Sequence, residues 1–404
     1  MRRTLALAES EQVRAARRAL GRQLAAFRAA AGLSQHRFAP LTHYGRSTVA
    51  NVEVGRQNVT RDFWQRCDEL LNADGALVRG YDELDALVSQ EREQRRGVPA
   101  AQLELGSSAQ VNEVLTHLRE QWHLLVKTDN LLGPRHALAG VLDQIAIMEA
   151  LLHSTRDKTR TEVILLAARY AESAAWLHED IGDMARARYW TGRAMEWAHE
   201  AGDPLMLAWT LFRRSQQATA AHDAGQVIGL ARAAGRDGDE LPAPMRAAIL
   251  QQEAQGHALD GDELASQLLL DEAHGWAATD DAGDARLGHG SFCTASYLEI
   301  QRAKCWQMVG KPRQAALLYE PALIDLPAVY HRDRGIALVG LANAYAATGE
   351  PERAATVAVK ALCIARSSGS TRMLHEVTAV GQTLSSFQAL APVKVLLDQL
   401  VGAV

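Results

Sequence analysis

The chain of 404 residues has few of the features that mark membrane proteins and secreted proteins. No run of apolar residues approaches the roughly 18 that a membrane-spanning helix needs, so we expect no membrane partner. The basic residues at the amino end are not followed by an apolar stretch, so we expect no secretory signal. The chain has only four cysteines, and they are too far apart to form a close-spaced metal pair: Cys67, Cys293, Cys305 and Cys363. We expect each of these cysteines to serve as a small apolar residue in a reducing cytoplasm.

Segments that alternate apolar and polar residues are also nearly absent, and aromatic residues make up only 5% of the chain. Almost no β-sheet is therefore expected. Alanine, leucine and arginine are abundant, and all three favour helix. The sequence predicts an all-α fold.

The sequence shows no motif that would hold a reacting group or a cofactor. Gly288 and Gly290 flank His289, but no third glycine follows at the spacing of a nucleotide-binding loop, so we interpret this segment as a turn in a mobile loop. Gly310-Lys311 is followed by proline rather than serine or threonine, which excludes a phosphate-binding loop. We expect no cofactor, no metal and no enzymatic activity.

Residues 33–56, in contrast, have the pattern of two short helices joined by a tight turn. Phe38 and Ala39 can face inward from the first helix, and Val49 and Val52 from the second. The remaining face of the second helix is small and polar, and it consists of Arg46, Ser47, Ala50 and Asn51. Short hydrogen-bonding side chains beside an arginine suit the major groove of DNA.

From about Arg17 to Leu71 the spacing resembles the phage-repressor type of helix-turn-helix, the XRE family. The segments Leu33-Ser34-Gln35 and 47–56 carry the resemblance. It implies that base edges are contacted by Arg46, Ser47, Ala50 and Asn51. It implies that phosphates are contacted by Gln35, Arg56, Gln57 and Asn58. It also implies a structural ion pair between Arg28 and Glu53, for which the alternative is two unrelated surface charges.

Three residues depart from the family pattern. His43 stands where the turn usually has glycine, so we expect the backbone to differ there. Gly45 replaces the usual serine or threonine cap, and glycine caps a helix only slightly less well. Pro40 lies inside the first short helix, where it removes a hydrogen-bond donor, so we expect that helix to end early.

The distribution of charge independently favours a polyanion-binding head. Residues 1–66 hold twelve arginines, no lysine and four acidic residues, a net charge of +8. The remaining 338 residues carry −13. Phosphate contacts supply most of the non-specific affinity for DNA. Some arginines of the first helix belong, on the alternative view, to an ordinary solvated helix face.

Three regions are expected along the chain: a DNA-binding domain at 1–75, a connecting helix and linker at 76–108, and a helical body at 109–404. The helix expected from Ala76 to about Arg95 has a narrow apolar stripe. This stripe leaves open whether the helix packs on the head, connects the two halves or pairs with another subunit.

The body contains an internal repeat that resembles the tetratricopeptide pattern. In such a pattern small residues let two helices approach, a large ring fills the gap and glycine makes the turn. The clearest copy is Leu341, Ala342, Tyr345, Gly349, Ala354, Ala358 and Ala361, and another 39 residues upstream is Trp306, Gly310, Ala315, Tyr319 and Ala322. We expect about five stacked hairpins forming an α-solenoid, closed by a capping segment from Met373 to Val404. The alternative is an irregular bundle with accidental spacing.

The concave wall of a solenoid is the usual surface for a ligand. Polar residues on the first helices of successive hairpins form a candidate groove: Arg169, Tyr170, Arg213, Arg214, Gln217 and Gln252. Arginine with glutamine and aromatic rings can bind a peptide or a small molecule. The alternative is hydrogen bonding between helices along a solvated groove.

A repressor-like head on a tetratricopeptide-like body resembles a group of bacterial regulators that includes the peptide-sensing quorum regulators. The resemblance implies a cytoplasmic homodimer on double-stranded DNA with an inverted-repeat operator, and possible control by an effector. The alternative is a protein-interaction scaffold or adaptor whose head has no regulatory role. A gel shift with a salt titration separates the two, because only a DNA-binding regulator should lose affinity steeply with salt.

Overall fold

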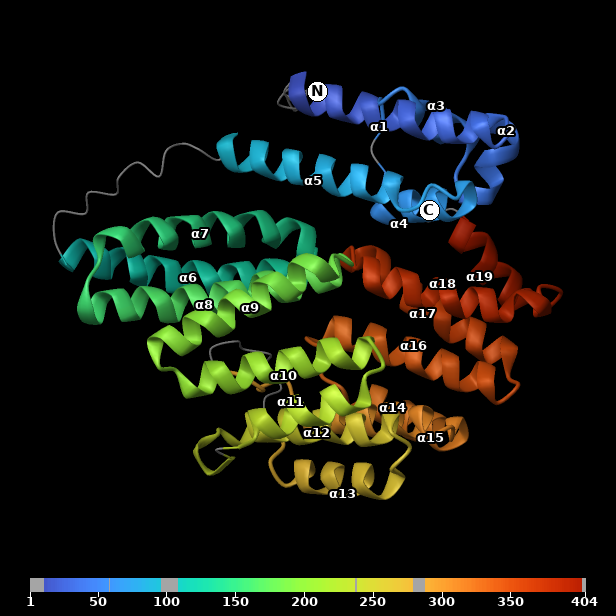
Figure 1. Ribbon diagram of the computed structural model, residues 1–404. Helices are drawn as coiled ribbons and strands as arrows, with labels where there is room; N and C mark the ends of the chain where they lie inside the picture. Colours follow the sequence, from blue (N-terminus) through green and yellow to red (C-terminus); the bar gives the residue numbers. More distant parts are fainter. Residues whose placement is uncertain (1–10, 58, 96–107, 237, 279–287, 402–404) are drawn as a thin grey trace, which may run out of the picture. The chain divides into compact units, whose positions relative to one another are not determined.

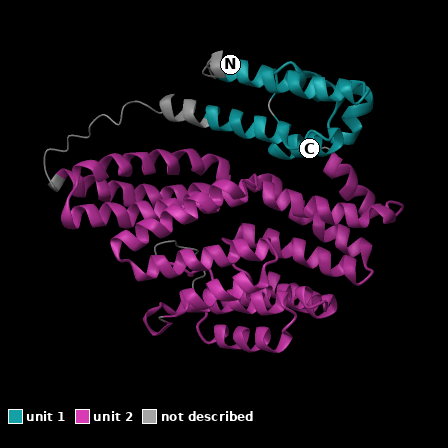
Figure 2. Cartoon of the chain, viewed as in Figure 1, with its two compact units in different colours: residues 1–102 teal, residues 103–404 magenta. Residues whose placement is uncertain are grey.

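The computed structural model describes residues 11–57, 59–95, 108–236, 238–278 and 288–401 (Figure 1). The described residues are 83% helical, and the only extended pairing among them is an isolated bridge between Ala278 and Thr294. The all-α expectation is confirmed. The chain divides into two compact units, residues 1–102 and 103–404 (Figure 2).

The first unit contains five α-helices and a short 3₁₀ helix in its described part. They are α1 (Glu11–Ala30), α2 (Gln35–Phe38), η1 (Ala39–Thr42), α3 (Arg46–Glu53), α4 (Arg61–Leu71) and α5 (Ala76–Arg95). Its core is formed by the side chains that face inward from each helix, among them Leu24, Phe38, Val49, Val52, Phe63 and Leu77. Gly21 allows α1 to lie against the end of α3, because a Cβ atom there would be 2.4 Å from the carbonyl oxygen of Val52.

Helix α5 belongs to the first unit, which therefore continues past residue 75. It packs against α1 and α4 and buries Leu77 and Leu84. The carboxylate of Asp68 accepts hydrogen bonds from the backbone N–H groups of Gly75 and Val78, each at 2.7 Å, and so holds the first turn of α5 against α4. Of the three arrangements that the sequence left open for this helix, the structure shows packing on the head.

The second unit is a series of helices that pack on their neighbours in chain order (Figure 1). They are α6 (Ser108–Leu132), α7 (Pro134–Ser154), α8 (Asp157–Asp180), α9 (Met184–Ala201), α10 (Pro204–Ala220), α11 (Ala224–Ala234), η2 (Gly238–Glu240), α12 (Ala243–Leu259), α13 (Glu263–His274), α14 (Ala295–Met308), α15 (Pro312–Asp325), α16 (His331–Ala347), α17 (Pro351–Ser368), α18 (Thr371–Leu384), η4 (Ser385–Phe387) and α19 (Ala391–Val401). We call this unit the body.

Repeated turns give the body its repeat-like character. Gly182, Gly261, Gly310 and Gly349 lie between the helices of the α8–α9, α12–α13, α14–α15 and α16–α17 pairs, and each has a φ between +77° and +85°. Glycine adopts this left-handed conformation without steric cost. The α10–α11 pair also has a left-handed residue at its turn, but here it is His222, at φ +56°, so the glycine of the repeat is absent from this copy.

The described part of the body has two large hydrophobic cores, divided within α14, and a small third cluster of Ala254, Ala258, Leu270 and Cys305. The first contains residues from Val111 to Leu298, and the second contains residues from Ile300 to Leu400. The last helices also contact the first ones, since α17 packs on α6 and α18 on α8. Their approach is close: a Cβ atom on Gly133 would lie 1.8 Å from the carbonyl oxygen of Ser368.

Within the described ranges, α7 is the one helix long and apolar enough to cross a membrane by length and composition alone. The sequence analysis considered only uninterrupted apolar runs. It therefore passed over this helix, because Asp143 and Glu149 interrupt its apolar residues. In the structure α7 packs on α6 and α8 and contributes Val141, Ile145 and Met148 to the first core.

Candidate DNA-binding surface and body cavity

Helix α3 is presented by the head with one face buried and one face free. Val49 and Val52 are buried, which fixes the rotation of the helix. Arg46 and Ser47 are exposed, and Ala50 and Asn51 are half-buried. The four residues assigned to base edges therefore lie off the buried stripe, on the side of α3 that a DNA groove requires.

The turn before α3 keeps the shape that glycine would favour. His43 has a φ of +62° and a ψ of +19°, so the expectation of a different backbone is wrong at this position. Pro40 ends α2 after four residues, and the chain continues as η1, where the missing N–H is tolerated in the first turn. Gly45 caps α3 in an extended conformation without a side-chain hydrogen bond.

A buried network ties α1, α2 and α3 together. Arg28 Nε donates to Glu53 Oε1 at 2.5 Å, and Arg28 Nη2 donates to Glu53 Oε2 at 3.0 Å. Gln35 Nε2 also donates to Glu53 Oε2, at 2.7 Å, and Arg28 Nη1 donates to the carbonyl of Leu33 at 2.6 Å. The ion pair is thus bidentate and sets the angle between the recognition helix and its supporting helices.

The residues assigned to phosphates have different surroundings. Gln35 is half-buried and holds Glu53, so only its second amide hydrogen remains for a phosphate. Arg56 and Gln57 are exposed directly after α3, and Asn58 lies outside the described residues. Gly55 has a φ of +72°, which lets the chain leave α3 against Arg18 and places Arg56 beyond the helix.

A family model described as a helix-turn-helix domain matches residues 19–79 of the chain. The matched segment begins in α1 and ends in the first turn of α5, and it includes the whole buried network. No curated protein matches the chain. The first unit therefore carries a helix-turn-helix domain, and this class of domain indicates DNA binding.

The body contains a cavity of about 290 Å³. Its walls come from α6, α7, α8, α10, α14, the start of α16 and the segments that precede α14 and α16. The lining is rich in aromatic rings, namely Trp122, Trp176, Trp209, Phe212, Phe292 and Tyr297. Most of these rings belong to the first hydrophobic core, whereas residues 329–333 of the lining precede and begin α16 and lie beside the second core.

Two of the six residues assigned to a ligand groove line this cavity. Arg169 lies over the ring of Trp122 at 5.1 Å, and Arg213 lies over the ring of Trp176 at 4.9 Å. Arg213 is only 4% exposed, and its Nη2 donates to Glu179 Oε2 at 2.7 Å. Both arginines are therefore placed against aromatic rings of the wall.

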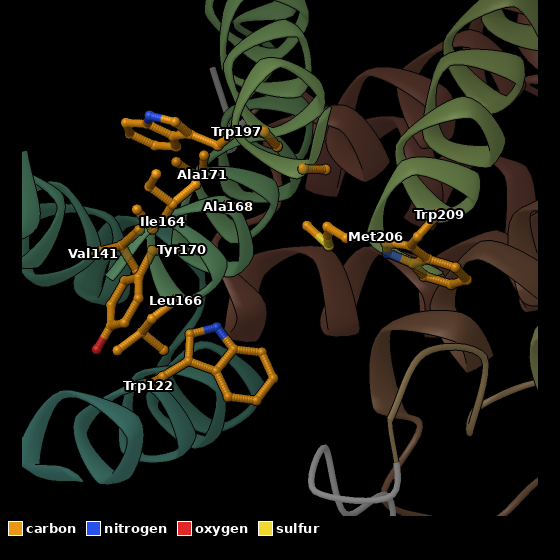
Figure 3. Packing of buried hydrophobic residues seen from close by; sticks show 14 of the residues in the cluster. Trp122, Val141, Ile164, Leu166, Ala168, Tyr170, Ala171, Trp197, Met206 and Trp209 are labelled. Carbon is orange, nitrogen blue, oxygen red and sulfur yellow. The ribbon is translucent and has the colours of Figure 1, made fainter. Parts of the chain in front are cut away.

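The other four do not line the cavity, and the groove interpretation is corrected for them. Tyr170 lies among Val141, Ile164 and Leu166 in the core, and its hydroxyl donates to the carbonyl of Leu118 (Figure 3). The guanidinium of Arg214 lies beside Gly192 of α9.

Gln217 and Gln252 belong instead to hydrogen bonds between helices. Gln217 Nε2 donates to Glu179 Oε1 at 2.8 Å and to Thr191 Oγ1 at 2.9 Å. Gln252 Nε2 donates to Thr219 Oγ1 at 2.6 Å. Since both amides are buried, these bonds satisfy polar groups that would otherwise destabilise the packing.

The sequence analysis did not identify His289 and Arg332 as residues of the cavity wall. His289, assigned to a turn, stacks on Trp209 with ring centroids 4.9 Å apart, and burial lowers its pKa to about 4. Arg332 of α16 pairs with Asp129 of α6 and with Asp180 of α8. No local pattern marks these residues, because their partners are up to 203 residues away in the chain.

Burial shapes the ionisation of the cavity wall. It raises the pKa of Glu172, against the opposing effects of Arg213 and the indole of Trp209. It also raises the pKa of Asp129 and of Asp333, although Arg332 lies next to both. Burial therefore disfavours the charged form of these three carboxyl groups.

No group of three or more histidine, cysteine or acidic side chains within the described ranges is arranged to hold a metal ion. The four cysteines are free thiols; Cys363 is exposed and the others are buried.

Proposed function

We propose that the protein is a sequence-specific, DNA-binding transcriptional regulator of the XRE type, and not an enzyme. The observation that carries the proposal is the helix-turn-helix match at 19–79, together with the free polar face of α3. In this proposal Arg46, Ser47, Ala50 and Asn51 contact base edges. Exposed Arg56 and Gln57 contact the phosphates beyond α3.

We further infer that the body is a tetratricopeptide-like solenoid that joins two chains into a homodimer in the cytoplasm. Glycine turns and small residues between paired helices support the repeat assignment. A dimer holding two heads about 34 Å apart would select an inverted-repeat operator. The cavity supports control by an effector, because its lining comes from elements beside both cores of the body.

Selection of bound sequences from a random duplex library tests the proposal. Removing a base contact by Arg46→Ala or Asn51→Ala should relax the preference at one position and cost about 1–3 kcal/mol of binding free energy. Arg56→Ala should weaken binding to all sequences about equally. It should also reduce the slope of log affinity against log salt concentration by about one. Arg79→Ala, which removes an exposed arginine of α5, is the matched control and should change neither quantity.

An unchanged selected sequence in the double variant lacking Arg46 and Asn51 would reject the assignment of α3. Analytical ultracentrifugation of the full chain tests the dimer independently. If the full chain is a monomer at micromolar concentration, the proposed homodimer is rejected, and any preference for an inverted repeat must have another origin.

A further inference from the structure

The size of the body cavity favours a small molecule over a peptide. Pockets for small ligands span about 300–1,000 Å³, and this cavity, at about 290 Å³, lies at the lower limit of that range. An extended peptide of several residues does not fit such a volume. Its occupant is therefore a compact molecule that can touch α8 and α16 at once.

Charged side chains of both signs line the cavity, and further carboxylates lie behind this lining. The lining contains the guanidinium groups of Arg169, Arg213 and Arg332 and the carboxylates of Asp129, Glu172 and Asp333. Glu179 and Asp180 do not line the cavity, but they pair with Arg213 and Arg332. Two of the three lining guanidinium groups are therefore engaged by carboxylates from behind the lining.

Of the three carboxylates that line the cavity, Asp129 is paired with Arg332, whereas Glu172 and Asp333 have no hydrogen-bonded guanidinium partner. Arg213 is engaged by Glu179 at 2.7 Å, which leaves Glu172 at 3.4 Å from Arg213 Nε without a hydrogen bond between them. Asp333 makes no hydrogen bond and no ion pair with any residue that the structure describes, although Arg332 precedes it in α16. Both side chains are half-buried, and a carboxylate that is partly removed from water favours a counter-charge or a proton.

A second observation points to a ligand in the same place. The indole of Trp209 is 5% exposed and lines the cavity, and its N–H makes no hydrogen bond of normal geometry, although it lies close enough to Glu172 to lower the pKa of that carboxyl. Around it the wall is aromatic. Aromatic faces and unbalanced carboxylates together attract a positively charged group on an apolar body.

We propose that the cavity binds a small organic amine, with its ammonium group facing Glu172 and Asp333 and its apolar body against the aromatic wall. The amine supplies a positive charge to these two carboxylates. Glu172 belongs to α8, which contributes to the first hydrophobic core, and Asp333 belongs to α16, which contributes to the second. The bound amine therefore links the parts of the body that surround the two cores. Its role as an effector rests on the proposed function, whereas its binding does not.

Charge-matched probes test the ligand class with the full chain and without DNA. The probes are tryptamine, indole-3-propionate and 3-methylindole, and a second set with a phenyl ring in place of the indole. Isothermal titration calorimetry should give the amines at least tenfold tighter binding than the carboxylate or neutral molecule of the same ring. The amines alone should raise the melting temperature.

Two variants locate the amine. Glu172→Gln and Asp333→Asn keep the shape of each side chain and should each reduce amine affinity at least fivefold, with no loss for the neutral probes. Glu320→Gln, an exposed carboxylate of α15 outside the cavity, is the control and should leave all affinities unchanged. Circular dichroism verifies that each variant is folded, and the two variants provide independent tests.

The proposal is overturned if the carboxylates bind as tightly as the amines, if no probe of either ring binds, or if both variants bind amines like the parent chain. These outcomes do not depend on DNA. Failure of the head to select a sequence would reject the proposed function and leave amine binding intact.

Discussion

Arg332 and Asp180 form an ion pair, with Nη1 and Oδ2 3.0 Å apart, although 152 residues separate them in the chain. The same guanidinium pairs with Asp129, and Ser370 Oγ donates to the other oxygen of Asp180 at 2.6 Å. Asp129 is 5% exposed and Asp180 is 1% exposed. This cluster joins the first helices of the body to α16 and α18, next to the cavity.

Replacing Arg332 should therefore open the contact between the two ends of the body. Arg332→Met leaves two buried carboxylates without their main partner, and breaking a buried pair costs about 3–5 kcal/mol. We expect a lower midpoint in chemical unfolding and faster amide hydrogen exchange in α16 and α18. Arg353→Met is the control, because Arg353 pairs with Glu320 on the surface and its loss should change little. Equal effects of the two changes would contradict this role of Arg332.

His178 should make the body sensitive to mild acid. Burial lowers its pKa from 6.5 to about 4, and neither ring nitrogen makes a hydrogen bond with a described residue. The unfolded chain binds the proton first, so stability is present above about pH 6.5 and is lost as the pH falls towards 4.

The variant His178→Phe tests this by comparing unfolding at pH 7 and pH 5. It should reduce the loss of stability between these values by about 1–2 kcal/mol. His289, with its pKa also lowered to about 4, contributes in the same direction, so part of the loss should remain. A difference between pH 7 and pH 5 that stays as large as in the parent chain would count against His178.

The turn residue His43 should limit the stability of the head. Its φ of +62° is unfavourable for any residue with a Cβ atom, and its side chain is exposed. We expect His43→Gly to be more stable than His43→Ala by about 1 kcal/mol in thermal unfolding, because only glycine relieves the left-handed conformation. The reverse order would show that the turn is not strained.

The Arg28–Glu53 pair should stabilise the head mainly by satisfying a buried charge. Arg28→Met leaves Glu53 with Gln35 as its main partner and should cost about 3–5 kcal/mol, whereas the double variant Arg28→Met with Glu53→Leu should recover part of this loss. Arg61→Met breaks the exposed pair with Asp82 and should cost less than about 1 kcal/mol. A double variant less stable than the single one would indicate that the geometry of the pair itself matters more.

The head was largely predictable, because its signals are local. The buried side of α3 follows from Val49 and Val52, three residues apart, and the early end of α2 follows from Pro40. The conformation at His43 was not predictable, because packing of the flanking helices imposes a backbone that the residue itself disfavours.

The cavity shows the opposite case. Arg213 was identified from its position on α10, but Gln217, one turn further along the same helix, points to Glu179 and Thr191. Side chains four residues apart on a helix occupy the same face, so periodicity alone could not separate a wall residue from an interhelical one.

The amino-acid sequence by itself determined where helices begin and end and which of their faces are apolar, because capping, periodicity and turn chemistry act within a few residues. It also determined the basic head and the acidic body. Only the tertiary structure decided that α17 and α18 pack on α6 and α8, and that the start of α16 lines a cavity together with α6 and α8. The reason is that the path of a stack of helices is the sum of many small rotations between neighbours. No local pattern encodes that sum, so Arg332 and Asp129 find each other only in the folded chain.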